Sequence, residues 1–261
     1  MTEFVDQDLA GTRFERVELR GATFREVDLT DARFYNVYLP GALIRGVWLE
    51  NVDINGEIRN VRINGVDIGP LIEAELNRRY PDRAKMRPDD ADGFRAAYDI
   101  LERLWAQTVD RARGLPEELL HERVDGEWSF IETLRHLVMA TDAWVLRAVL
   151  GEPAPYHPLG LPHDEMPADT PNVPRDLTIR PSLDEILAAR AERMARVRQV
   201  LADLTDERLA GMTEAVLEPG YPESESFAVR RCLQAILNEE WEHRLFAERD
   251  LDALEPMRPP G

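Results

Sequence analysis

Residues 22–46 read ATFREVDLTDARFYNVYLPGALIRG, and this stretch decides the fold of the N-terminal part of the chain. A bulky apolar residue recurs at every fifth position, at Phe24, Leu29, Phe34, Leu39 and Ile44. An alanine or a valine stands two places before each of them. Neither the helical period of 3.6 residues nor the strand period of two produces a sustained spacing of five. The pattern therefore predicts a coil that turns a corner every five residues.

The five-residue spacing extends in both directions from this stretch. Its further central positions are Phe4, Leu9, Phe14, Leu19, Leu49 and Ile54, followed after a one-residue deletion by Ile58, Ile63 and Ile68. The units ATFRE, ARFYN and ALIRG resemble the pentapeptide-repeat family, and the resemblance covers residues 2–68. It implies a short right-handed quadrilateral β-helix over residues 1–69, with the Phe and Leu side chains stacked inside. Residues 70–91 are expected to form a capping helix and a linker.

The remainder, residues 92–261, predicts an all-α four-helix bundle. Apolar residues at helical spacing indicate helices over about 93–113, 129–150, 182–204 and 226–254. Ser129 with Glu132, and Ser182 with Glu185, have the spacing of capping boxes at two of the helix starts. Long amphipathic helices without a strand pattern between them are typical of a bundle, which places metal and ligand sites among its facing helices. The chain is thus expected to have two domains.

Charge and composition exclude several classes of function. The 261 residues carry 32 Lys and Arg against 50 Asp and Glu, which gives a net charge of −18. So acidic a surface repels nucleic-acid backbones and anionic lipid heads, so we expect neither as a partner. The lone cysteine, Cys232, excludes an internal disulfide, and the N-terminus has no signal-peptide pattern, which favours the cytoplasm. A small-molecule substrate is the expected partner, and a homodimer stays open.

Three residues form a candidate metal site. Glu239 and His243 lie four residues apart in the last predicted helix and therefore on one face, within its apolar stripe. His136 lies in the second helix, where its neighbours at helical spacing are small. A His, Glu, His set with open positions matches the ligands of a catalytic zinc or another divalent metal. On the residues alone, a hydrogen-bonded Glu–His pair and a separate core histidine remain the alternative.

Residues 92–254 resemble the DinB/YfiT-like superfamily of metal-binding bundles, through GEWSFIETLRHLVMATDAWV and ILNEEWEHRLFAERDLDAL. The family motif falls on His136, Glu239 and His243, with Glu239 where many members have histidine. The resemblance implies a metal-dependent transferase or isomerase that activates a low-molecular-weight thiol of the mycothiol or bacillithiol type. Zinc is the first expected metal, with nickel, iron or manganese as alternatives. Glu240 and Asp142 are the expected outer residues that orient the imidazoles.

Two non-enzymatic functions stay open beside this one. The bundle could hold a metal and a ligand without turnover, as a stress-associated binding protein. Alternatively, an acidic pentapeptide-repeat coil could mimic DNA and occupy a topoisomerase. Residues 1–70 carry 8 Arg against 12 Asp and Glu, a net charge of 8 − 12 = −4, which is weak for such mimicry. The weak charge therefore disfavours DNA mimicry, and the non-enzymatic binding protein stays open as the alternative to the metal-dependent enzyme.

Overall fold

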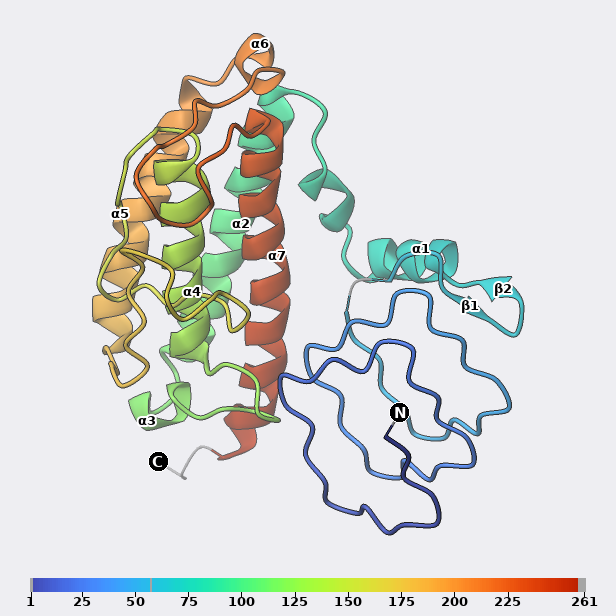
Figure 1. Ribbon diagram of the computed structural model, residues 1–261. Helices are drawn as coiled ribbons and strands as arrows, with labels where there is room; N and C mark the ends of the chain where they lie inside the picture. The colour runs from blue at the N-terminus through green and yellow to red at the C-terminus, as the bar shows by residue number, and fades with distance from the viewer. Residues whose placement is uncertain (1, 57, 258–261) are drawn as a thin grey trace. The chain divides into compact units, whose positions relative to one another are not determined.

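The computed structural model describes residues 2–56 and 58–257, and the chain divides into two compact units (Figure 1). The first unit is Met1–Glu57 and the second is Ile58–Gly261. None of the described helices has the length and apolar character that a membrane span requires.

The first unit is a coil that turns at every fifth residue. The residue at each corner has a positive φ: Asp6, Gly11, Arg16, Gly21, Glu26, Asp31, Asn36, Gly41, Gly46, Asn51 and Gly56. All except Arg16 and Glu26 are Gly, Asn or Asp, the residues that adopt this left-handed conformation at least cost. Short backbone hydrogen bonds, such as Ala22 N–H to Leu19 O at 3.0 Å, close alternate corners. The predicted five-residue turn is therefore present.

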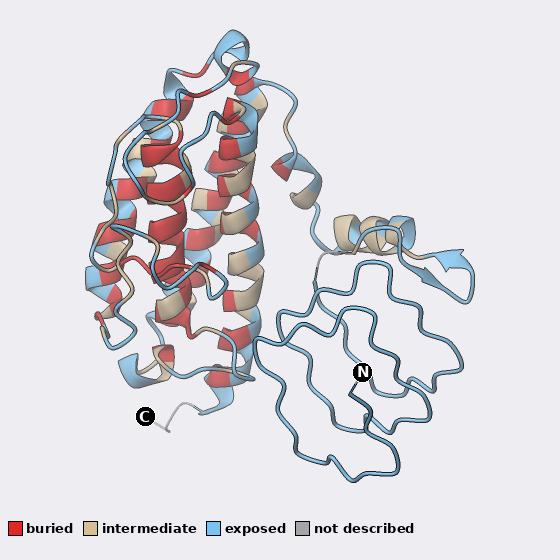
Figure 2. Ribbon diagram, in the orientation of Figure 1, coloured by how far each residue is buried: buried red, intermediate tan, exposed pale blue. Residues whose placement is uncertain are grey.

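The strands and the apolar interior of the predicted β-helix are not seen in residues 2–56. No strand is assigned there, and the large central side chains from Phe4 to Ile54 are 41% to 67% exposed (Figure 2). The backbone hydrogen bonds described in this segment all close local turns, and none joins one coil to the next. A β-ladder joins neighbouring backbones about 4.8 Å apart through hydrogen bonds, and residues 2–56 show no such ladder. The coil therefore has the turns that the repeat predicts but not the predicted sheet.

A small hairpin and a helix open the second unit. Strands β1 (Arg62–Ile63) and β2 (Val66–Asp67) pair antiparallel across Asn64 and Gly65, both at positive φ. Helix α1 (Gly69–Arg79) follows, with Pro70 in its first turn, as expected for the predicted helix. A 3-10 turn, η1 (Arg83–Met86), leads into the bundle.

The second unit is a bundle of four long helices, as predicted. The helices are α2 (Ala91–Ala112), α4 (Phe130–Thr141) with its π-helical continuation η2 (Asp142–Arg147), α5 (Leu183–Ala202) and α7 (Val229–Leu254). Shorter turns are α3 (Glu117–Leu120), α6 (Asp206–Leu209) and η3 (Glu255–Met257). Helix α4 packs against both α5 and α7, and its side chains are almost all buried (Figure 2).

Local sequence signals account for most of the helix starts. At α4, Ser129 Oγ accepts the Glu132 N–H and the Glu132 carboxylate accepts the Ser129 N–H, and Ser182 with Glu185 repeats this box at α5. Ser226, the first residue of the last predicted helix, does not cap it and instead donates to Thr213 O at 2.6 Å. Helix α7 accordingly begins later, at Val229, without a side-chain cap.

Candidate metal centre

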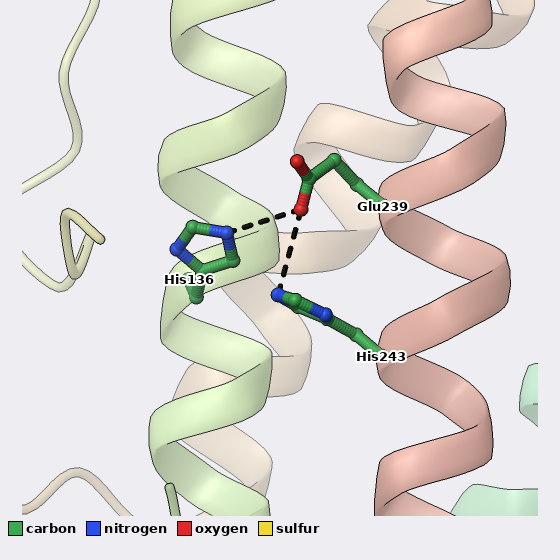
Figure 3. A group of neighbouring side chains, drawn as sticks. All are labelled: His136, Glu239 and His243. Atoms are coloured by element: carbon green, nitrogen blue, oxygen red, sulfur yellow. Dashed lines mark hydrogen bonds and ion pairs between the residues drawn. The ribbon is translucent and has the colours of Figure 1, made fainter. Parts of the chain in front are cut away.

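Helices α4 and α7 bring the three predicted ligands together. His136 comes from α4, and Glu239 and His243 lie one turn apart on the face of α7 that meets it (Figure 3). His136 Nε2 lies 3.1 Å from Glu239 Oε2, and His243 Nε2 lies 3.4 Å from the same oxygen. One ligand atom from each of the three residues lies within 4.8 Å of the other two. The site thus joins residues more than a hundred positions apart.

A backbone carbonyl fixes the ring of His136. His136 Nδ1 lies 3.1 Å from Leu161 O, and because a carbonyl can only accept, Nδ1 carries the proton and donates it. In a neutral imidazole Nε2 then presents a lone pair, and it faces the Glu239 carboxylate oxygen. Two acceptors at this distance require a cation between them, either a proton or a metal ion.

The surroundings of His243 favour a metal ion over a proton as this cation. Both of its ring nitrogens are buried and make no hydrogen bond in the described structure. Burial, followed by the neighbouring His136, lowers the pKa of His243 to about 4, so the imidazole is neutral at pH 7. A proton shared by His136 and Glu239 would leave His243 without a partner, whereas a metal ion would use a lone pair from all three residues.

Glu239 has the charge that a cation site needs. Burial raises the pKa of its carboxyl, but the hydrogen bond with His136 and the electrostatic interactions with His136 and His243 outweigh burial and bring the pKa below its usual value. Glu239 is therefore ionised at neutral pH, and one carboxylate with two imidazoles is a donor set that suits zinc or a similar divalent ion.

A cavity of about 210 Å³ opens onto the three residues. Aromatic, methionine and alanine side chains complete its wall: Trp128, Met139, Ala140, Ala143, Trp144, His163, Met166 and Tyr221. Trp128 packs on both imidazoles, with ring centroids 4.6 Å from His136 and 5.9 Å from His243. Ala140 on α4 and Ala143 on η2 have small side chains, which leave room beside the site.

The sequence model of the DinB superfamily matches residues 100–247, which include all three candidate ligands. The chain belongs to the DinB superfamily. Pentapeptide repeats match residues 7–46 in eight copies, so both resemblances seen in the sequence are confirmed. No curated protein and no solved structure matches the chain.

The expected outer residues of the DinB site, Glu240 and Asp142, do not contact the imidazoles. Glu240 forms a two-bond ion pair with Arg190, at 2.9 and 3.3 Å, on the other side of α7. Asp142 accepts from Arg193 Nε at 2.9 Å and from the His157 N–H at 2.7 Å. Adjacent residues on a helix point about 100° apart, so Glu240 faces α5 when Glu239 faces α4. The orienting group is the carbonyl of Leu161 instead.

Three residues at the DinB site were missed by the sequence analysis. Trp128 comes from the loop before α4, His163 from the proline-rich loop between η2 and α5, and Tyr221 from the loop before α7. Loop residues carry no periodic signal that would assign them to a shared face. The lone cysteine, Cys232, is buried, and burial raises the pKa of its thiol to about 11, which fits core packing.

Arg135 anchors the loop that positions His136. Its guanidinium donates to the carbonyls of Leu159, Asp176 and Ile179 at 2.7 to 2.9 Å, and its own carbonyl accepts the Leu161 N–H at 3.1 Å. A buried arginine on α4 thus holds the loop whose Leu161 carbonyl sets the tautomer of the adjacent His136.

Replacing Arg135 by methionine should loosen this loop. We expect the free energy of unfolding to fall by about 3 kcal/mol, since three loop carbonyls lose a charged donor, and metal affinity to fall about 10- to 100-fold. Urea denaturation and metal titration measure the two effects. Arg198→Met is the control, because Arg198 makes an exposed ion pair with Glu102 on the same bundle and should cost less than about 1 kcal/mol. Unchanged metal affinity in Arg135→Met would contradict the positioning role.

Proposed function

We propose that His136, Glu239 and His243 bind one divalent metal ion and that the site activates a low-molecular-weight thiol. Zinc is the first candidate for the metal, and nickel, iron and manganese are the alternatives. The observation that carries the proposal is the convergence of two imidazoles and one carboxylate on one point, where neither ring nitrogen of His243 makes a hydrogen bond in the described structure. These three residues would hold the metal and leave it room for a further ligand, and the metal would supply the Lewis acidity that lowers the pKa of a thiol and so favours the nucleophilic thiolate.

The proposed reaction is transfer of the thiol sulfur to a small electrophile. The S–H bond breaks and its proton passes to solvent, the sulfur electron pair forms a bond to the electrophilic carbon, and the leaving group departs with the electrons of the bond it loses. In this chain, Leu161 O holds His136 in the required tautomer, and Trp128 covers both imidazoles. The cavity supplies space for the reactants beside the ligands.

A conjugation assay tests the proposed activity. Zinc-loaded full-length protein should form the thioether of 2-mercaptoethanol and 1-chloro-2,4-dinitrobenzene at least tenfold faster than the uncatalysed reaction. Glu239→Gln, which keeps the shape and removes the charge, should abolish the acceleration. Glu242→Gln, on an exposed position of the same helix, should retain it. Bound zinc without any acceleration would instead support the non-enzymatic binding function.

A further inference from the structure

The wall of the cavity beside the three candidate ligands carries a single formal charge. Apart from Glu239, its described residues are histidine, aromatic, methionine or alanine, and none is arginine, lysine or aspartate. Two tryptophans and a tyrosine offer flat faces, and Met139 and Met166 offer adaptable apolar ones.

The buried arginines of the bundle are not free to pair with an anionic group of a ligand in the cavity, because each already has partners. Arg190 and Arg193 pair with Glu240 and Asp142. Arg135 and Arg147 donate to backbone carbonyls of the surrounding loops. Apart from a bound metal ion, a ligand carboxylate inside the cavity would therefore meet no cationic side chain in the described lining, and desolvating an unpaired charge costs several kcal/mol.

The volume of the cavity and the polar group of His163 further restrict the kind of ligand that we expect there. A cavity of about 150 Å³ is enough to hold benzene, so 210 Å³ accommodates one substituted ring or a short branched chain. His163 Nε2 is buried in the described structure without a hydrogen-bond partner, and its ring lies 5.4 Å from that of Tyr221. One neutral polar group on the ligand would satisfy it.

We infer that the reactant inside this cavity is a compact, mainly aromatic or branched apolar molecule. It carries one sulfur that would bind the metal and no other charged group, and His163 hydrogen-bonds its one neutral polar group. This inference rests on the proposed function. It favours thiol transfer involving an apolar partner over a reaction of a substrate that carries carboxylates. It also identifies His163 as a residue that determines specificity.

Two thiols that differ by one carboxylate test the inference. Full-length protein is loaded with cobalt(II), and the sulfur-to-cobalt charge-transfer absorption is titrated with benzenethiol and with 4-mercaptobenzoate. Benzenethiol should half-saturate at a concentration at least tenfold lower. Ala143→Leu, which fills the cavity, should weaken benzenethiol binding at least tenfold without loss of cobalt. Ala106→Leu, at an exposed position of α2 outside the cavity wall, is the matched control and should bind benzenethiol as the wild type does.

The outcomes separate the two proposals. Equal or tighter binding of 4-mercaptobenzoate by cobalt-loaded wild type would overturn the inference and leave the metal site standing. Bound cobalt without a charge-transfer band from either thiol would overturn thiol activation and the inference with it. Failure to bind cobalt would overturn the proposed function itself.

Discussion

Replacing Glu240 by alanine is expected to lower the free energy of unfolding by about 3–5 kcal/mol. Glu240 and Arg190 form a two-bond ion pair whose side chains are each only 4% exposed, and Arg190 also lies over the Trp105 ring at 4.9 Å. Without the carboxylate, Arg190 remains buried with an uncompensated charge. Urea denaturation of the metal-free protein measures the loss.

The double replacement Arg190→Met with Glu240→Leu is the control for this prediction. Because both charges are removed together, no unpaired ion remains, and we expect stability close to that of the wild type or above it. A loss below about 1 kcal/mol in Glu240→Ala alone would mean that water reaches the pair, as it does at surface ion pairs.

Replacing His243 by leucine should have opposite effects on metal affinity and on stability. Metal affinity should fall by more than 100-fold, because even an outer partner of a ligand is worth 10- to 100-fold. The metal-free protein should become about 1–3 kcal/mol more stable, since two buried nitrogens without hydrogen bonds are removed. Zinc titration and urea denaturation in the presence of a chelator measure the two effects.

Tyr98→Phe separates this effect from a general gain of core stability. The Tyr98 hydroxyl is likewise buried without a hydrogen-bond partner among the described residues, but Tyr98 lies outside the cavity. Its replacement should stabilise the protein and leave zinc affinity unchanged. If His243→Leu destabilised the metal-free protein, His243 would have a structural role that the described contacts do not show.

The sequence predicted those features that depend on local periodicity and chemistry. The five-residue spacing locates each corner of the coil, and the Ser129 and Ser182 boxes start two helices where expected. Glu239 and His243 share a face because four residues make slightly more than one helical turn. Pairing between coils is a long-range interaction, and a strict repeat predicts the turn without establishing that the backbones meet.

The surroundings of the site depended on contacts that no local pattern specifies. Glu240 and Asp142 were wrongly assigned to the imidazoles because their partners, Arg190 and Arg193, lie on α5, whose rotation about its own axis was unknown. The carbonyl of Leu161 is a backbone group in a loop, so side-chain identity gives no sign of its role. Physical reasoning from sequence thus found the three residues that converge at the candidate site and missed the groups that surround them.

The metal content of the full-length chain tests the central claim most directly. Protein purified without chelator and then titrated with zinc should bind one equivalent per chain, and saturation should raise the melting temperature because the metal binds the folded state. His136→Ala and Glu239→Gln should lose both the bound zinc and the thermal shift. Wild-type protein that binds no zinc, nickel, iron or manganese, with a melting temperature indifferent to all four, would contradict the account and leave His136 and Glu239 as an ordinary ion pair.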